Sequence, residues 1–208
     1  VSSAASDVYK RQLSDLATTL GLNNIYKIGL SNAQKGLVPN KKWKKSYLDQ
    51  GWYQGETLIT CIGQGFNLTS PLQLANLYSA LLNGGKFPFP KLIKDEPTKY
   101  LGEELNTTHQ KAILNALKAA VQEPSGTAYK LNLNNPNFVK IGGKTGTSQV
   151  RRITVAERES EDFRKKEVEW KKRDHALFVG YMPVEKPRYA VSVVIEHGGS
   201  GASTAAPI

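Results

Sequence analysis

The clearest pattern along the chain is an apolar face at helical spacing behind Ser70. Ser70 and Gln73 have the spacing of a capping box, and Pro71 stands at the first helical position. Apolar residues then recur three or four positions apart until a glycine pair ends the run; they are Leu74, Leu77, Tyr78, Leu81 and Leu82. The pattern predicts a helix at about residues 71–83.

A second capping-box pattern, formed by Thr107 and Gln110, opens another amphipathic segment. Its apolar face continues to Val121, and Pro124 and Gly126 are residues that interrupt helices. We expect a helix from Thr107 that ends before Pro124.

The first part of the chain carries weaker signals. Leu13–Leu20 has the pattern of a helix tail closed by Gly21, because glycine favours the left-handed conformation found at helix C-termini. Residues 22–61 contain scattered glycines and a lysine cluster, Lys41–Lys45, and are expected to be rich in loops. We interpret the lysine cluster as a solvated loop, with contact to anionic lipid head groups or a lipid-linked substrate as the alternative.

Three extended segments follow the helices. Phe138–Ser148 contains a glycine-rich turn, and Ala176–Met182 and Tyr189–Glu196 are rich in β-branched and aromatic residues. The last two segments are separated by residues 183–188, a length that suits an antiparallel hairpin. The order of elements predicts a mixed α/β chain of the α+β kind.

Residues 151–174, between the first two of these strands, are strongly charged. They hold nine basic and seven acidic residues, with Phe163, Val168 and Trp170 as the few apolar anchors. Such a composition can bury little apolar area. We expect a solvated, partly helical insertion outside the core.

Composition narrows the classes of function. The chain has 208 residues and a net charge of +10, which permits one domain, or most of one, and suggests an anionic partner. No apolar run reaches the roughly 18 residues that a membrane span needs. Cys61 is the single cysteine and the three histidines are scattered, so we expect neither an intrachain disulfide nor a metal site. No recognition motif for nucleic acid accompanies the basic charge, so nucleic acid is not expected as a partner.

The run Lys144-Thr145-Gly146-Thr147 carries the candidate chemistry. A phosphate-binding P-loop would need glycine at position 138, which is Phe138. The other mechanism is the Lys-Thr-Gly strand of serine acyl-transferases that act on penicillin-like substrates. There Lys144 would supply a positive charge beside the nucleophile, Thr145 and Thr147 would donate hydroxyl hydrogen bonds to a substrate carboxylate, and the Thr147 N–H would face the oxyanion. Gly146 would leave room for an extended peptide beside the strand.

Several further runs accompany this motif in order and at compatible spacing, and together they resemble the class B penicillin-binding proteins. The similarity is strongest to the elongation-type members and covers about residues 16–208. The runs that carry it are Gly36-Leu37-Val38-Pro39 with Trp43-Lys44, Gly51-Trp52-Tyr53-Gln54-Gly55-Glu56-Thr57, Ile62-Gly63-Gln64-Gly65-Phe66, Thr69–Ala75, Asn83-Gly84-Gly85, Gly126-Thr127-Ala128 and His197–Ser203.

The resemblance implies a penicillin-binding transpeptidase fold, shared with serine β-lactamases, in which a mostly antiparallel sheet packs between helices. It implies a peptidoglycan D,D-transpeptidase that needs no cofactor: a serine attacks the D-Ala-D-Ala end of a stem peptide, D-Ala leaves, and an amine of a neighbouring stem takes the acyl group. β-Lactams would acylate the same serine. Lys144, Thr145, Gly146 and Thr147 would be catalytic, and Thr145, Thr147, Ser148 and Gln64 would bind substrate.

The resemblance also implies a setting for the whole protein. It would be held in the bacterial cytoplasmic membrane by an N-terminal anchor, with the catalytic domain in the periplasm. Its partners would be peptidoglycan stem peptides, lipid-linked precursor, a glycosyltransferase and other proteins of the elongation machinery.

The sequence departs from the family pattern at the nucleophile. Neither Ser-x-x-Lys nor Ser-x-Asn occurs in the 208 residues, so we expect no catalysis by this chain alone. Residues 1–12 resemble a non-native leader, and the chain stops after a Gly- and Ser-rich turn with no predicted closing element. We therefore expect residues 13–208 to be the C-terminal part of a transpeptidase domain, incomplete as a fold.

Two other functions stay open. The same fold could serve a non-catalytic module that binds cell-wall fragments, or a related serine β-lactamase that hydrolyses its substrate. The pair Gly198 and Ser200 resembles part of a nucleophile elbow, but Ala202 replaces the last glycine, and a loop beside the site is the favoured interpretation. His109 and His175 are expected at exposed or capping positions, and His197 nearer the cleft. We expect Trp52 and Tyr53 to serve packing rather than substrate contact.

Overall fold

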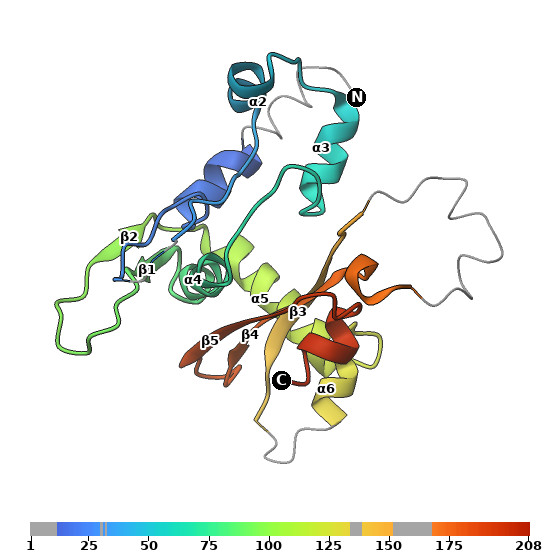
Figure 1. The fold of residues 1–208 in the computed structure, drawn as a ribbon. Helices are drawn as coiled ribbons and strands as arrows, with labels where there is room; N and C mark the ends of the chain where they lie inside the picture. Colours follow the sequence, from blue (N-terminus) through green and yellow to red (C-terminus); the bar gives the residue numbers. More distant parts are fainter. Residues whose placement is uncertain (1–11, 30, 32, 134–138, 152–167) are drawn as a thin grey trace. The chain divides into compact units, whose positions relative to one another are not determined.

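The computed structural model describes residues 12–29, 31, 33–133, 139–151 and 168–208 (Figure 1). The chain divides into two compact units, Val1–Leu114 and Asn115–Ile208, and the division falls within one helix, α5. Each unit has its own cluster of buried apolar side chains.

Residues 22–61 of the first unit contain two helices that the sequence interpretation missed, while the described residues of 22–40 and 49–53 are loops or turns as predicted. Helix α2 spans Lys41–Leu48 and helix α3 spans Gln54–Cys61. Each begins at a side-chain cap, because the Asn40 side chain accepts from the Trp43 N–H and the Glu56 carboxylate accepts from the Tyr53 N–H. The lysine cluster therefore lies on a helix and not in a loop.

The two other helices of the first unit follow the sequence pattern. Residues 12–19 are helical and are followed by Gly21 at a φ of 97°, as predicted. Helix α4 spans Pro71–Leu82, and the capping box of Ser70 and Gln73 is present. These predictions are confirmed.

The first unit also contains a small hairpin that the sequence did not predict. Strand β1 (Lys86–Pro88) pairs in antiparallel fashion with β2 (Tyr100–Gly102). Phe87 of β1 is buried with residues of α4 and of the segment before it. The buried cluster consists of Leu20, Tyr26, Ala80, Leu81 and Phe87.

Helix α5 spans Thr107–Gln122, as predicted, but its cap differs from the prediction. The Asn106 side chain accepts from the N–H groups of Thr108 and His109, so Asn106 caps the helix and Thr107 is its first residue. The Gln110 amide instead donates to the carbonyl of Leu81 on α4. The Gln110 side chain thus makes a tertiary hydrogen bond and not the capping-box contact that the sequence predicted.

The second unit is built on a three-stranded antiparallel sheet, as predicted. Its strands are β3 (Gly142–Ser148), β4 (His175–Met182) and β5 (Tyr189–Ile195), in the order β3-β4-β5. Ser148 lies opposite His175, and Met182 opposite Tyr189. The predicted start of the first strand at Phe138 lies outside the described residues.

Short helices complete the second unit. Helix α6 (Tyr129–Leu133) was not predicted, and a π-helix spans Gly201–Ala205 near the C-terminus. The expectation that no element closes the chain is therefore wrong. The π-helix packs against the sheet because Gly201 has no side chain: a β-carbon there would collide with the carbonyl oxygens of Gly146 and Leu177.

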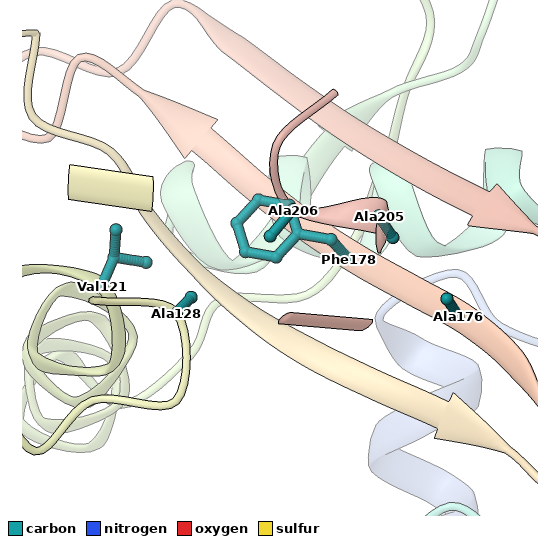
Figure 2. Packing of buried hydrophobic residues seen from close by; sticks show 6 residues of the cluster. All are labelled: Val121, Ala128, Ala176, Phe178, Ala205 and Ala206. Atoms are coloured by element: carbon teal, nitrogen blue, oxygen red, sulfur yellow. The ribbon is translucent and has the colours of Figure 1, made fainter. Parts of the chain in front are cut away.

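The core of the second unit joins the sheet, α5 and the C-terminal segment. Figure 2 shows Phe178 of β4 beside Ala205 and Ala206, with Val121 and Ala128 across the strand β3. Phe178 is 3% exposed, and Val121 and Ala205 are fully buried. This cluster supports the sheet from α5 and from the C-terminal segment.

Only the end of the charged insertion is described. Residues 152–167 lie outside the described residues, and Trp170–Lys172 form a 3₁₀ turn before β4. Among the residues that the structure describes, no helix combines the length and apolar character that crossing a bilayer requires.

Candidate active site

The predicted motif Lys144-Thr145-Gly146-Thr147 lies in the middle and last part of β3. β4 pairs with one side of β3, and no described strand pairs with the other side. Lys144 and Thr147 are exposed, and Thr145 and Gly146 are half-buried. An extended peptide can add to such a strand edge through main-chain hydrogen bonds.

The Lys144 and Thr145 side chains lie together. Lys144 Nζ is 3.0 Å from the Thr145 carbonyl oxygen and 3.4 Å from Thr145 Oγ1, and donates to both. Thr145 Oγ1 in turn lies 3.2 Å from Thr127 Oγ1. The structure thus places a cation and two hydroxyl groups at one position of the edge strand.

The two glycines before Lys144 serve packing. A β-carbon on Gly142 would collide with the ring of Tyr181, and one on Gly143 would collide with Phe178 and the carbonyl of Val179. Both glycines lie in a β-strand, whereas a P-loop would wrap a phosphate before a helix. The structure therefore supports the rejection of the P-loop interpretation.

Gly146 is crowded from the protein side. A β-carbon there would lie 3.3 Å from Leu177 Cβ, and Gly201 packs directly on its backbone. A side chain at residue 146 would therefore require Leu177 to shift by a few tenths of an ångström, whereas it is Gly201 that must lack a side chain to pack on this backbone.

Ser148 and Gln64 occupy different surroundings. Ser148 is the exposed last residue of β3, next to the motif. Gln64 belongs to the first unit, where its N–H donates to the Ile59 carbonyl and its own carbonyl accepts from the Asn67 amide. The substrate-binding roles of both residues stay predictions.

A pair of histidines at the end of the sheet was missed by the sequence interpretation. The His197 N–H donates to His175 Nδ1 at 2.9 Å, and His197 Nδ1 lies 3.0 Å from the Arg173 carbonyl. A carbonyl only accepts, so His197 carries its proton on Nδ1, while His175 Nδ1 carries none. We expected His175 at an exposed or capping position; it is half-buried, and its ring accepts a backbone N–H. Trp170 packs edge-on against the His197 ring. Nothing in the sequence spacing of these residues indicated that they meet.

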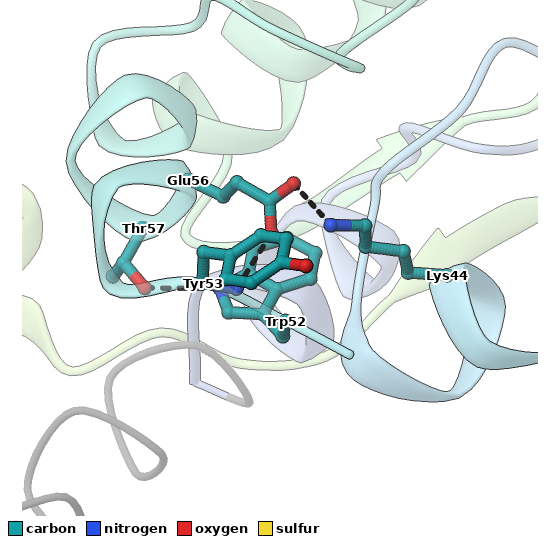
Figure 3. Close-up of polar contacts among 5 residues, drawn as sticks. All are labelled: Lys44, Trp52, Tyr53, Glu56 and Thr57. Atoms are coloured by element: carbon teal, nitrogen blue, oxygen red, sulfur yellow. Dashed lines mark hydrogen bonds and ion pairs between the residues drawn. The ribbon is translucent and has the colours of Figure 1, made fainter. Parts of the chain in front are cut away.

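The lysine cluster of the first unit holds a second unexpected contact, shown in Figure 3. Lys44 is 1% exposed and pairs with Glu56 of α3, and its Nζ lies 4.4 Å from the centre of the Tyr53 ring. The interpretation of this cluster as a solvated loop is therefore wrong, because one of its lysines is buried. A buried cation keeps its charge only with such partners.

Trp52 and Tyr53 make the packing contacts that we expected. The Trp52 indole donates to Thr57 Oγ1 at 3.1 Å, and Tyr53 covers the Lys44 ammonium while its ring remains largely exposed (Figure 3). The two residues help to fix the turn between α2 and α3.

Burial raises the pKa of two tyrosines, one in each unit. Loss of hydration is the main cause for both Tyr26 and Tyr181, and the Glu185 carboxylate raises the pKa of Tyr181 further. Within the described ranges, no three His, Cys, Asp or Glu side chains gather closely enough to hold a metal ion.

Comparison with known proteins agrees with this architecture. The family model of the penicillin binding protein transpeptidase domain matches residues 2–208. A curated relative, the peptidoglycan D,D-transpeptidase MrdA of Salmonella typhimurium, is 31% identical over 193 residues, which are 87% of this chain and 30% of the relative. The chain thus spans about a third of the length of such relatives.

Two solved structures are similar over nearly the whole chain. Pseudomonas aeruginosa PBP2 in complex with WCK 5153 has a TM-score of 0.76 and 29% identity, covering 97% of this chain and 42% of that one. The Helicobacter pylori complex of PBP2 with MreC has a TM-score of 0.70 and 29% identity, covering 94% and 35%. The expected fold and the expected resemblance to penicillin-binding protein 2 are confirmed. The chain belongs to the family of penicillin-binding protein transpeptidase domains.

Proposed function

We propose that the whole protein is a peptidoglycan D,D-transpeptidase that works by serine acyl transfer. The observation that carries the proposal is the position of Lys144, Thr145 and Thr147 on the edge strand β3, where an extended peptide can lie beside them. The transpeptidase family of the chain supplies the reaction type.

In the proposed reaction, a serine oxygen attacks the carbonyl carbon of the penultimate D-Ala, the peptide bond to the terminal D-Ala breaks, and the leaving amine takes the proton that the serine hydroxyl gave up. An amine of a second stem peptide then attacks the acyl ester and forms the cross-link, and its released proton returns to the serine oxygen. Lys144 stabilises negative charge near the nucleophile, and the hydroxyls of Thr145 and Thr147 bind the terminal carboxylate. The Thr147 N–H serves the oxyanion, and Gly146 leaves the approach open.

The serine itself comes from outside these 208 residues in this proposal. The sequence contains neither Ser-x-x-Lys nor Ser-x-Asn, and the two motifs are the family's source of nucleophile and proton transfer. The 208 residues alone should therefore not be labelled by a fluorescent penicillin.

The setting proposed for the whole protein follows its relatives. One solved structure contains PBP2 of Helicobacter pylori together with MreC, which supports elongation-machinery proteins as partners here. We place the catalytic domain in the periplasm, anchored to the bacterial cytoplasmic membrane by a segment outside the 208 residues. Lipid-linked precursor, stem peptides and a glycosyltransferase that supplies glycan strands would be its further partners.

The test is the rate at which a fluorescent penicillin acylates the whole protein. We expect Lys144→Ala to lower that rate about 100-fold, the effect of removing one group that stabilises developing charge. Lys140→Ala is the matched control, because Lys140 is an exposed lysine before β3 whose side chain pairs with Glu185 on the surface. Both variants should melt at the temperature of the wild type.

Two outcomes would contradict the proposal. A wild-type whole protein that takes no label at all would favour a non-catalytic binding module. An unchanged rate in Lys144→Ala would remove Lys144 from the reaction.

A further inference from the structure

The loop after α5 holds Thr127 in a fixed place. The Gly126 N–H donates to the Glu123 carbonyl at 2.8 Å, and the Ala128 N–H donates to the Ala120 carbonyl at 3.0 Å. Gly126 must be a glycine, since a β-carbon would collide with the carbonyls of Ala119 and Ala120. Ala128 is buried in the core beside β3 (Figure 2). Thr127 is therefore anchored on both sides, although its own side chain is exposed.

The anchored side chain reaches the motif strand. Thr127 Oγ1 lies 3.2 Å from Thr145 Oγ1, and Lys144 Nζ donates to the same Thr145 oxygen. In this arrangement the Thr145 hydroxyl donates its proton to Thr127. A hydroxyl has one proton and two lone pairs, so Thr145 cannot donate to Thr127 and to a ligand at once.

A bound carboxylate would change the direction of this hydrogen bond. Carboxylates only accept, so Thr145 must turn its proton toward the ligand to bind it. The Thr127 hydroxyl can then rotate and donate to the lone pair of Thr145 Oγ1 that now faces it. No proton is transferred between residues, because only the two O–H bonds rotate.

We propose that Thr127 is a positioning residue for substrate recognition. It accepts from Thr145 in this structure and would donate to Thr145 when a carboxylate is bound, which keeps Thr145 in the rotamer that faces the ligand. The inference rests on the proposed function, because it needs Thr145 as a carboxylate ligand.

The test compares two acylating reagents on the whole protein. One is a penicillin with its free carboxylate, and the other is the methyl ester of the same penicillin. Thr127→Val removes the hydroxyl and keeps the shape of the side chain, while Thr127→Ser keeps the hydroxyl. Ser125→Ala is the matched control, because Ser125 is an exposed hydroxyl residue of the same loop.

We expect Thr127→Val to lower the acylation efficiency of the free penicillin about three- to tenfold, the value of one neutral hydrogen bond. The loss should appear as weaker binding at low penicillin concentration and not as a slower rate at saturation. The methyl ester should react with Thr127→Val as it does with the wild type. Thr127→Ser should recover most of the loss, and Ser125→Ala should show none.

Three results would overturn the inference and leave the proposed function standing. These are an unchanged efficiency in Thr127→Val, an equal loss with the methyl ester, or a loss in Thr127→Ser as large as that in Thr127→Val. A wild type that neither penicillin acylates would overturn the proposed function and this inference together.

Discussion

Each of the two units of the chain is stabilised internally by a different kind of contact. In the first unit, Gln73 is completely buried, and its amide donates to the carbonyls of Asn24 at 2.8 Å and Lys35 at 2.7 Å while its oxygen accepts from Ser70. The buried Lys44 ammonium and the half-buried Glu56 carboxylate form a second polar contact there. In the second unit, the backbone pairing of the sheet and the apolar cluster around Phe178 hold the segments together.

The difference shows where local pattern carries information. Strand β4 buries consecutive residues such as Phe178 and Val179, and β5 is half-buried along most of its length, so both strands stand out in the sequence as continuous apolar and β-branched runs. The loops of the first unit are joined by single polar side chains that must find all their partners, because an unsatisfied buried polar group is costly. The strands of the second unit thus carry a continuous apolar pattern, whereas the loops of the first unit depend on individual polar residues.

The largest expected effect comes from removing the main apolar side chain of the second unit. Phe178→Ala should lower the free energy of unfolding of that unit by about 4 kcal/mol, because it leaves a cavity beside Ala205. Urea unfolding followed by amide hydrogen exchange measures each unit separately. An equal loss of amide protection in residues 12–114 would contradict the expectation that the variant destabilises mainly the second unit.

A somewhat smaller effect is expected from the ion pair of Lys44 with Glu56 in the first unit. Lys44→Met should lower the free energy of unfolding by about 2 kcal/mol, because the half-buried Glu56 carboxylate loses its charged hydrogen-bond donor. The double variant Lys44→Met with Glu56→Gln should recover part of the loss. If the double variant is as unstable as the sum of the singles, the two residues do not act as a pair.

The cap of α5 distinguishes the observed structure from the sequence pattern. Asn106→Ala should lower stability by about 1 kcal/mol, since two backbone N–H groups lose their acceptor. Thr107→Ala should have less effect, because Thr107 is the first residue of the helix and not its cap. If Thr107→Ala lowers the melting temperature more than Asn106→Ala does, Thr107 is the cap, as the sequence pattern predicted.

The smallest effect is on the pH dependence of stability. Burial raises the pKa of Tyr181, so the unfolded chain loses the phenol proton at a lower pH than the folded chain. The contribution is fully present below pH about 10, the ordinary tyrosine value, and is lost as the pH rises above it. Tyr181→Phe should flatten the fall of unfolding free energy between neutral and alkaline pH, and Tyr26→Phe should do the same for the first unit. Identical slopes in wild type and both variants would contradict this.

Part of the fold could be predicted because its signals are local. Ser70, Pro71 and Gln73 announce α4, and the β-branched runs after His175 and Arg188 announce the hairpin of β4 and β5. Local signals gave a wrong prediction where a side chain has a distant partner. Gln110 has the spacing of a capping box but donates to Leu81, 29 residues away. Helices α2 and α3 were missed although each has a local cap, at Asn40 and at Glu56. The pairing of Lys44 with Glu56 across 12 residues has no local pattern that could have been read.

The candidate site divides in the same way. The motif and its place on a strand could be predicted from the residue types of Lys144, Thr145 and Gly146 and from a strand pattern that ends at Ser148. The contact of the motif with Thr127 could not be predicted, because Thr127 lies 18 residues before Thr145 and is held beside it by the packing of Ala128 and the turn at Gly126. The histidine contact between residues 175 and 197 likewise needs β4 and β5 to pair first.

By itself the sequence determined the helices with capping signals, the antiparallel hairpin, the motif on its strand and the family to which the chain is similar. The tertiary structure alone decided that Lys44 is buried, that Gly201 packs on Gly146 and that Thr127 reaches Thr145. The physical reason is that backbone preference and apolar periodicity act over a few neighbouring residues, whereas a buried polar partner or a close backbone contact exists only after distant segments have packed.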